Sequence, residues 1–237
     1  MQVRADRHHR WDVTLEEAKA IQNRLRRQVI VTGPDSPPRT IAGVDVSFPK
    51  KSSPTPIARA AIVLLSFPDL VPLAQTVVDV PVTFPYIPGL LAFREGPAIL
   101  AALEELDETP DLMIFDGHGL AHPRRMGIAT HMGLLLDLPA IGCAKSRLCG
   151  YYEEPGPERG DRSPLLEGEE VIGMVVRSRT GVSPIFVSIG HRVSLESAVE
   201  IVLRCCTKYR LPEPTRLAHQ AAAGVQVVPS AHQPGLF

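Results

Sequence analysis

The sequence contains few cysteines, and nothing in their arrangement suggests a cross-link. Cys143, Cys149, Cys205 and Cys206 are the four cysteines in a chain of 237 residues. Their spacing matches neither the paired ligands of a structural zinc site nor the cysteine framework of a small disulfide-stabilised domain. We therefore expect reduced thiols, most of them buried.

Long hydrophobic runs are missing too. The most apolar stretch, residues 60–65, is much shorter than the roughly 18 to 20 residues that a membrane-spanning helix needs. Residues 1–11 are polar and have no apolar run behind them, so a secretory signal is not expected. These absences predict a cytoplasmic protein with no membrane segment.

The chain also lacks an excess of one charge. It has 25 lysines and arginines against 26 aspartates and glutamates, a net charge of −1, which argues against a histone-like protein. The charges are nevertheless unevenly distributed. Residues 117–136 contain histidines and arginines but no acidic residue, whereas residues 151–170 contain seven acidic residues. The first segment suits contact with phosphates, and the second does not.

The remaining composition is that of an ordinary globular protein, with 44% hydrophobic and 22% charged residues. A chain of this length can bury a sizeable core. No repeat or linker divides it, so we expect a single domain over residues 1–237. Residues 224–237 lack periodicity and are expected to form a loose tail.

The hydrophobic pattern predicts an α/β fold. Three strand-like segments joined by short turns favour an antiparallel meander, and the strands and helices that alternate after it favour parallel pairing. A capping box at Thr14 and Glu17 marks the first helix, and Ser194 and Thr215 are expected to cap the last two. Residues 153–168 are expected to form a loop. The expected strands are residues 40–48, 57–67, 73–80, 112–115, 140–144, 171–176 and 185–189.

Two aspartates interrupt or end apolar strands. Asp45 lies in residues 41–48, which are apolar on both faces, and Asp116 follows the apolar run 112–115. An unpaired buried charge is costly, so each needs a partner; a hydrogen-bonded turn aspartate is the alternative interpretation. If the two strands are neighbours, both carboxylates meet at one sheet edge, where paired oxygen ligands favour Mg²⁺ or Mn²⁺ over zinc.

Glu95 offers a third carboxylate. It lies near the start of a predicted helix, before Gly96 and Pro97, where the helix dipole alone also favours an acidic residue. The three groups lie on the first strand, on the helix after the meander and at the end of the next strand. This order is similar to that of ribonuclease H-like nucleases.

Five motifs resemble those of the endonuclease V family. The similarity follows the family's order over residues 40–148 and returns near the C-terminus. The motifs are IAGVDVSF at 41–48, PYIPGLLAFRE at 85–95, DGHGLAHPR at 116–124, GCAKS at 142–146 and LPEPTRLAH at 211–219. The resemblance implies a ribonuclease H-like mixed sheet flanked by helices.

The resemblance also implies an activity. The family cleaves DNA beside deaminated bases, chiefly hypoxanthine in deoxyinosine, at the second phosphodiester bond 3′ to the lesion, leaving 3′-hydroxyl and 5′-phosphate ends. By this resemblance Asp45, Glu95 and Asp116 hold Mg²⁺, for which Mn²⁺ substitutes. His219 is then a further ligand or lies behind the ligands, and Lys145 contacts the phosphate or the attacking water.

A wedge, a base pocket and phosphate contacts are implied in the same way. The strand-separating wedge is the turn Pro85, Tyr86, Ile87 and Pro88, which two prolines stiffen. The pocket for the everted base is Gly89, Leu91, Gly117, Gly119 and Leu148. The phosphate contacts are His122, Arg124 and Arg125.

Other functions on the same scaffold stay open. An inosine-specific ribonuclease or a branched-DNA nuclease would differ from a DNA repair enzyme by a few contacts. A lesion-binding protein without activity would not need the three carboxylates, and a small-molecule phosphatase would not need the turn at Tyr86. The expected partner is DNA with deoxyinosine or another deaminated base, inosine RNA is a further candidate, and the protein is expected to be a monomer.

Overall fold

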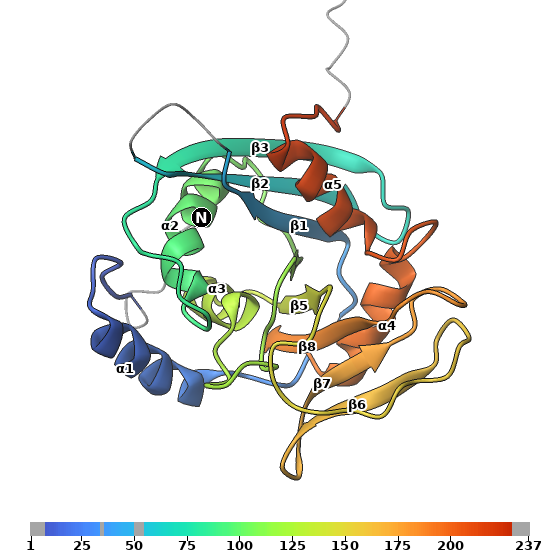
Figure 1. Ribbon diagram of the computed structural model, residues 1–237. Coiled ribbons are helices and arrows are strands. Elements are labelled where there is room, and N and C mark those ends of the chain that lie inside the picture. The colour runs from blue at the N-terminus through green and yellow to red at the C-terminus, as the bar shows by residue number, and fades with distance from the viewer. Residues whose placement is uncertain (1–7, 34–35, 50–54, 229–237) are drawn as a thin grey trace, which may run out of the picture.

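The structure is a computed structural model that describes residues 8–33, 36–49 and 55–228. One mixed sheet forms its centre, with the strand order β3-β2-β1-β4-β5-β8-β7-β6, and helices pack around it (Figure 1). The strands are β1 (Thr40–Ser47), β2 (Ile57–Ser66), β3 (Pro72–Pro81), β4 (Leu112–Phe115), β5 (Ala140–Ala144), β6 (Arg162–Glu167), β7 (Glu170–Val176) and β8 (Ile185–His191). The helices are α1 (Leu15–Leu25), the short 3₁₀ helix η1 (Arg26–Gln28), α2 (Leu91–Glu104), α3 (Ile128–Leu136), α4 (Leu195–Cys205) and α5 (Glu213–Ala222).

The strand β1 lies inside the sheet and joins its antiparallel and parallel parts. It pairs antiparallel with β2 and parallel with β4, so that Val44 lies opposite Phe115. β2 and β3 complete the meander, and β5 pairs parallel with β4. This arrangement confirms the predicted ribonuclease H-like fold class. It also makes the strands of Asp45 and Asp116 neighbours, joined by a 3.1 Å backbone hydrogen bond from Asp116 to Val44.

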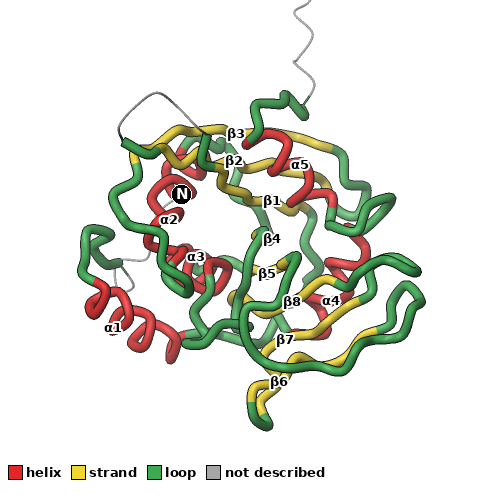
Figure 2. The backbone as a smooth tube through the Cα atoms, in the orientation of Figure 1, coloured by secondary structure: helices red, strands yellow, loops and turns green. Residues whose placement is uncertain are grey.

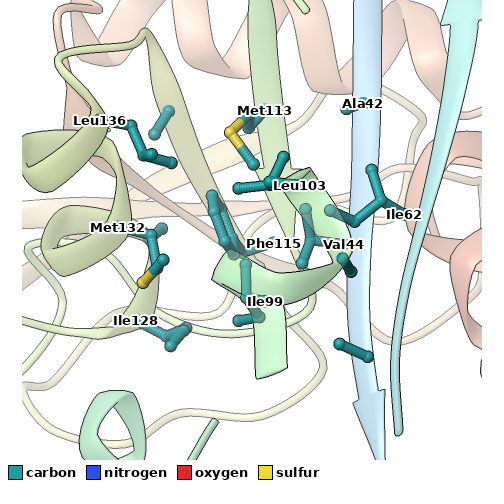
Figure 3. Packing of buried hydrophobic residues seen from close by; sticks show 14 of the residues in the cluster. Ala42, Val44, Ile62, Ile99, Leu103, Met113, Phe115, Ile128, Met132 and Leu136 are labelled. Carbon is teal, nitrogen blue, oxygen red and sulfur yellow. The ribbon is translucent and has the colours of Figure 1, made fainter. Parts of the chain in front are cut away.

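The helices α2 and α3 cover one face of the sheet and enclose a hydrophobic core. Figure 3 shows Phe115 of β4 among Ile99 of α2, Met132 of α3 and Val44 of β1. Phe115 is 1% exposed, and burying a side chain of this kind contributes about 1.5–3 kcal/mol. On the other face, α4 packs against β8, and α5 packs against β1 and β2. The core therefore holds α2 and α5 against the central strands from opposite sides.

Two predicted helix caps are confirmed. The Thr14 hydroxyl accepts a hydrogen bond from the Glu17 backbone at 3.2 Å, and the Glu17 carboxylate accepts one from the Thr14 backbone at 2.7 Å. Ser194 accepts from the backbone of Ser197 at 3.1 Å. Such caps satisfy N–H groups that the first turn of a helix leaves unpaired.

The predicted cap at Thr215 is wrong. The helix α5 begins at Glu213, after Pro212, and Thr215 lies inside its first turn. Its hydroxyl donates to the Pro212 carbonyl at 3.1 Å instead of accepting from a backbone N–H. Pro214 explains the earlier start. The backbone N–H groups in the first turn of a helix have no partner within the helix, so a proline, which has no N–H, is well tolerated there.

The expected loop at residues 153–168 contains a strand, so this prediction is also wrong in part. β6 (Arg162–Glu167) pairs antiparallel with β7. Its burial alternates, with Ser163 and Leu165 buried, but the prolines, glycines and acidic residues around it obscure this short pattern at the sheet edge. Before β6, Arg177 binds the carbonyl groups of Pro155 and Gly156 and pairs with Glu154. The acidic segment is therefore anchored to the sheet.

The first part of the predicted loose tail is also held in place. Residues 224–228 follow α5 as a loop near β3 (Figure 2). The side-chain oxygen of Gln75 accepts hydrogen bonds from the backbone of Val227 and Val228 at 2.8 and 3.2 Å. Residues 229–237 lie outside the described residues.

All four cysteines are free thiols, and Cys143, Cys205 and Cys206 are buried, which confirms the expectation for them. Across the described ranges, no helix combines the length and apolarity needed to span a membrane. The eight strands belong to one sheet, and the parallel strands β1, β4 and β5 end at the same edge of it.

Candidate active site

Three residues from distant parts of the chain meet where the central strands end. Asp45 lies in β1, Asp116 directly follows β4, and His219 is on α5. Each offers one ligand atom, and these atoms all lie within 4.8 Å of one another. His219 Nδ1 is 2.9 Å from Asp45 Oδ2. The fold thus brings together two of the three predicted carboxylates and the predicted histidine.

Glu95 adds a third carboxyl group near this cluster. It lies on α2 and is half-buried. Burial, and then the charges of Asp45 and Asp116, raise the pKa of Glu95 from 4.5 to about 8 against the opposing charge of Arg94. Burial and the charge of Asp116 also raise the pKa of Asp45. These acids destabilise one another's charged forms, which is the electrostatic situation that a bound cation relieves.

The donor set fits a hard divalent cation. Asp45, Asp116 and Glu95 offer carboxylate oxygens, the ligands that Mg²⁺ and Mn²⁺ prefer. His219 offers one imidazole nitrogen, which Mn²⁺ also accepts. The composition of the cluster and the raised pKa of Glu95 therefore both indicate a site for a divalent cation.

Lys145 places a positive charge beside the carboxylates. It directly follows β5 and donates a short hydrogen bond to Asp116 Oδ2. Its side chain is 42% exposed, so the ammonium group is accessible from solvent. A charge held in this way can meet a phosphate that approaches the sheet edge.

The position of His219 depends on close packing between α5 and β1. A Cβ atom on Gly43 would lie 1.9 Å from the carbonyl oxygen of Pro214, so only glycine permits this approach. At the other end of the helix, the Ser47 hydroxyl donates to the carbonyl of Ala222 at 2.9 Å. Both ends of α5 are thereby held on β1, and His219 lies next to Asp45.

We expect Gly43→Ala to lower the free energy of unfolding by about 1–3 kcal/mol, because α5 must shift to accept the added methyl group. The shift separates His219 from Asp45, so the affinity for Mn²⁺ falls as well. Urea denaturation and calorimetric Mn²⁺ titration measure the two effects. The control is Gly33→Ala, where the nearest atom to the new Cβ is 3.8 Å away. Wild-type affinity and stability in Gly43→Ala would contradict this account of α5.

A second close contact holds the helix that carries Glu95. A Cβ atom on Gly96 would lie 2.6 Å from ring atoms of Trp11. Trp11 also packs against Phe93 of the same helix, with ring centroids 6.0 Å apart. The segment before α1 therefore contacts α2 one residue from Glu95. No motif in the sequence indicated this contact.

A cavity of about 340 Å³ opens beside Asp116 and Lys145. This volume lies in the range of small-ligand sites. Four of the five predicted base-pocket residues line it, namely Gly89, Leu91, Gly117 and Leu148. Gly119 lies behind the lining, where its Cβ position is 2.0 Å from the carbonyl oxygen of Ile189. Gly119 therefore packs on β8 and does not face the cavity.

The predicted wedge forms one wall of this cavity. Tyr86, Ile87 and Pro88 line it, while Pro85 precedes them in the turn. Tyr86 is 69% exposed, whereas Ile87 packs on the hydrophobic cluster that contains Phe84. The turn is thus anchored on one side and presents an exposed aromatic ring at the cavity entrance.

The carbonyl group of Gly89 accepts hydrogen bonds from three side chains. The donors are Gln22, His122 and Arg124, at 3.1, 3.0 and 2.6 Å. Since His122 Nδ1 accepts from the Arg124 backbone, its Nε2 carries the proton that reaches Gly89. Burial and the charge of Arg124 lower the pKa of His122 to about 4, so its ring is neutral at physiological pH. These side chains hold the end of the wedge turn in place.

In the structure the predicted phosphate-binding residues bind protein acceptors, and their contact with phosphates stays a prediction. His122 is 2% exposed, and the donors of His122 and Arg124 described above point to Gly89. Arg125 forms ion pairs with Glu167 and with Glu170, the latter at 2.7 Å. Its charge is compensated by the β6–β7 hairpin. The sequence did not reveal these protein acceptors, because they lie far from residues 122–125 in the chain.

A family model covers most of the chain that forms this site. The model of endonuclease V matches residues 23–220, a range that includes the three carboxylates, Lys145 and His219. The chain belongs to the endonuclease V family. Members of this family are nucleases, so the chain is a hydrolase of phosphodiester bonds with a role in DNA repair.

Individual endonuclease V proteins show the same relationship. Endonuclease V of Nostoc punctiforme is 51% identical over 218 residues, which cover 92% of this chain and 97% of the relative. The crystal structure of endonuclease V from Streptomyces avermitilis has a TM-score of 0.85 at 44% identity, and the match covers 90% of this chain and 93% of that one. Endonuclease V from Ciona intestinalis was solved with a 24-mer DNA containing an inosine followed by a ribo-adenosine. It is 31% identical with a TM-score of 0.78, covering 89% of this chain and 96% of that one.

Gln22 also supports this endonuclease V site, although no motif in the sequence indicated it. Gln22 lies on the buried face of α1 together with Ala18 and Leu25. It is 0% exposed, donates to Gly89 and Met126, and accepts from Arg124. A glutamine at helical spacing between two apolar residues is a signal that could have identified it, because a buried amide needs hydrogen-bond partners.

Proposed function

We propose that the protein is a Mg²⁺-dependent endonuclease for deoxyinosine in DNA that hydrolyses the second phosphodiester bond 3′ to the lesion. The observation that carries this proposal is a cluster of two carboxyl groups and a histidine beside a cavity whose entrance bears an exposed tyrosine. Asp45, Asp116 and His219 form the cluster, and Tyr86 lies at the entrance. The inosine-containing DNA in the Ciona intestinalis complex supports the same substrate.

Asp45, Glu95 and Asp116 would hold the cation, with His219 beside them. When bound, Mg²⁺ supplies Lewis-acid stabilisation of the attacking water and of the leaving 3′ oxygen. Lys145 binds a non-bridging oxygen of the scissile phosphate with the ammonium N–H groups that do not donate to Asp116. Because α5 is held on β1, His219 keeps Asp45 oriented toward the same point.

Recognition of the base is assigned to the cavity and the wedge. Tyr86 enters the base stack and fills the space that the everted base leaves. Gly89, Leu91, Gly117 and Leu148 surround the everted base, and a main-chain N–H there donates to the carbonyl oxygen of hypoxanthine, whereas the amino group of adenine cannot accept this hydrogen bond. The three donors on the Gly89 carbonyl keep this wall rigid, so that the cavity does not adapt to normal bases.

Cleavage of a labelled duplex containing one deoxyinosine tests the proposal. We expect one nick, at the second phosphodiester bond 3′ to the lesion, and a product that DNA ligase reseals because its ends are 3′-hydroxyl and 5′-phosphate. The nick is absent with a chelator and returns with Mg²⁺ or Mn²⁺. The same duplex with deoxyadenosine is the control. Equal cleavage of both duplexes, or a nick elsewhere, would contradict the assignment.

Inosine RNA is a second candidate substrate. The observation that favours it is the ribo-adenosine after the inosine in the Ciona intestinalis complex, since it places a 2′-hydroxyl next to the lesion. An inosine RNA of the same sequence, assayed beside the DNA, ranks the two by kcat/KM. The cytoplasmic location and the monomeric state expected from the sequence stay predictions.

A further inference from the structure

Two further cavities lie next to Lys145, outside the cluster and the base cavity. One, of about 420 Å³, is lined by Lys145 and Arg210 among others, and the other, of about 600 Å³, by Ser146 and Arg147. Both are also lined by Tyr152, Glu154 and Phe186. Lys145, Ser146 and Arg147 also line the base cavity. The two cavities therefore form one groove, called the Tyr152 groove below, that continues from the proposed active site.

The groove has an aromatic wall. The rings of Tyr152 and Phe186 pack edge to face, with centroids 5.5 Å apart and planes at 77°. Phe186 belongs to β8 and is 5% exposed, so it supports Tyr152 from the core. The Arg147 guanidinium lies 5.8 Å from the centroid of the Tyr152 ring. A supported aromatic ring with a guanidinium beside it combines two groups that bind single-stranded nucleic acid, namely a surface for base stacking and a positive charge.

The groove also carries uncompensated positive charge. Arg210 donates to the carbonyl groups of Ser183, Pro184 and Lys145, and Arg147 donates to that of Gly150. Among residues 8–33, 36–49 and 55–228, no carboxylate forms a salt bridge with either arginine. The acidic residue of the groove, Glu154, is paired with Arg177 at 2.8 Å. The net charge along the groove therefore suits phosphates.

We propose that the Tyr152 groove binds nucleotides that flank the scissile phosphate in the lesion-containing strand. One base stacks on Tyr152, and the adjoining phosphates lie near Arg147 and Arg210. This inference rests on the proposed function, because the groove is placed by its continuity with Lys145. Its contribution is to affinity for unpaired nucleotides and not to the hydrolysis step, since Tyr152, Arg147 and Arg210 lie outside the carboxylate cluster.

The test is Tyr152→Ala, assayed on a deoxyinosine strand with long flanks on both sides. We expect KM to rise about tenfold, or about 1.4 kcal/mol, with kcat little changed, because one base loses the aromatic ring on which it stacks. Tyr152→Phe keeps the ring and should retain the wild-type KM. The matched control is Tyr151→Ala: this neighbour is 54% exposed, its hydroxyl donates to the Gly168 carbonyl, and it lines neither cavity.

A second variant covers the case in which Tyr152→Ala is unstable. Arg147 is exposed, so Arg147→Gln should fold normally. We expect it to reduce the slope of log KM against log salt concentration by about 1, the effect of one lost phosphate contact. On a deoxyinosine strand whose flanks are too short to reach the groove, the KM of each variant should equal that of the wild type.

The outcomes separate this inference from the proposed function. If the wild type does not cleave deoxyinosine DNA, the proposed function fails. The groove can then still be tested by fluorescence anisotropy, which compares the affinities of the wild type and the variants for a labelled oligothymidylate. If the wild type cleaves but Tyr152→Ala and Arg147→Gln behave like Tyr151→Ala, the groove inference alone fails. Equal losses on long and short strands would also overturn it, because they would indicate damage to the active site.

Discussion

Replacing Asp45 with asparagine is expected to lower single-turnover cleavage of deoxyinosine DNA by about 10³-fold, or about 4 kcal/mol of transition-state stabilisation. Asparagine keeps the shape of the side chain but removes one of the charges on which the cation depends. Asp45 lies within 4.8 Å of the ligand atoms of Asp116 and His219, so the substitution affects the centre of the cluster. The affinity for Mn²⁺, measured by calorimetry without DNA, should fall in parallel.

The matched control for this prediction is Asp107→Asn, which alters an exposed aspartate in the turn after α2. Its cleavage rate should equal that of the wild type. Thermal denaturation of Asp45→Asn in a chelator should show no loss of stability, because burial and Asp116 already raise the pKa of Asp45 and oppose its charge. Cleavage by Asp45→Asn within a few fold of the wild-type rate would exclude Asp45 as a ligand.

Glu95→Gln is expected to abolish cleavage and yet stabilise the metal-free protein at alkaline pH. Burial and the charge of Asp45 raise the pKa of Glu95 from 4.5 to about 8. Between these values the folded state keeps a proton that the unfolded state has lost, so the free energy of unfolding falls as the pH rises. A pKa shift of this size lowers the free energy of unfolding by about 5 kcal/mol once the pH is above both values. Glutamine removes most of this loss because it has no charge to bury.

Urea denaturation in a chelator, at about pH 5 and about pH 8, measures this effect. The two proteins should be similar at the lower pH, and the variant should be more stable at the higher pH. Added Mg²⁺ should stabilise the wild type more than Glu95→Gln. Glu104→Gln, an exposed position in the last turn of the same helix, serves as the control. A wild-type stability that does not fall with pH in the chelator would contradict the environment assigned to Glu95.

Asp45 and Asp116 could be predicted from the sequence because their signal is local. Each is an acidic residue in or directly after an apolar strand, and a charge in such a place needs a partner. Their proximity followed once the two strands were taken as neighbours, which the parallel pairing of β1 and β4 confirms. The capping box at Thr14 is local in the same sense, since it involves residues three positions apart.

The interactions of His122, Arg124 and Arg125 could not be predicted in this way. As a basic segment without acidic neighbours in sequence, residues 122–125 resemble a phosphate-binding loop. In the fold, however, His122 and Arg124 reach Gly89, which is more than thirty positions away, and Arg125 reaches Glu170. A charged side chain shows in the sequence what it can bind, but not which acceptor lies nearest.

The sequence by itself determined the order of the strands and helices apart from β6, the carboxylates that interrupt them and, through its motifs, the family. These features depend on hydrophobic periodicity and on residue types within a few positions of each other. The motifs implied that His219 belongs to the site, but only the tertiary structure placed its ring against Asp45, 174 positions away. Only the tertiary structure also decided that Gln22 supports Gly89 and that Tyr152 faces a groove continuous with Lys145. Such contacts arise when packing brings distant segments together. At Gly43 and Pro214 the close approach is possible because glycine has no side chain.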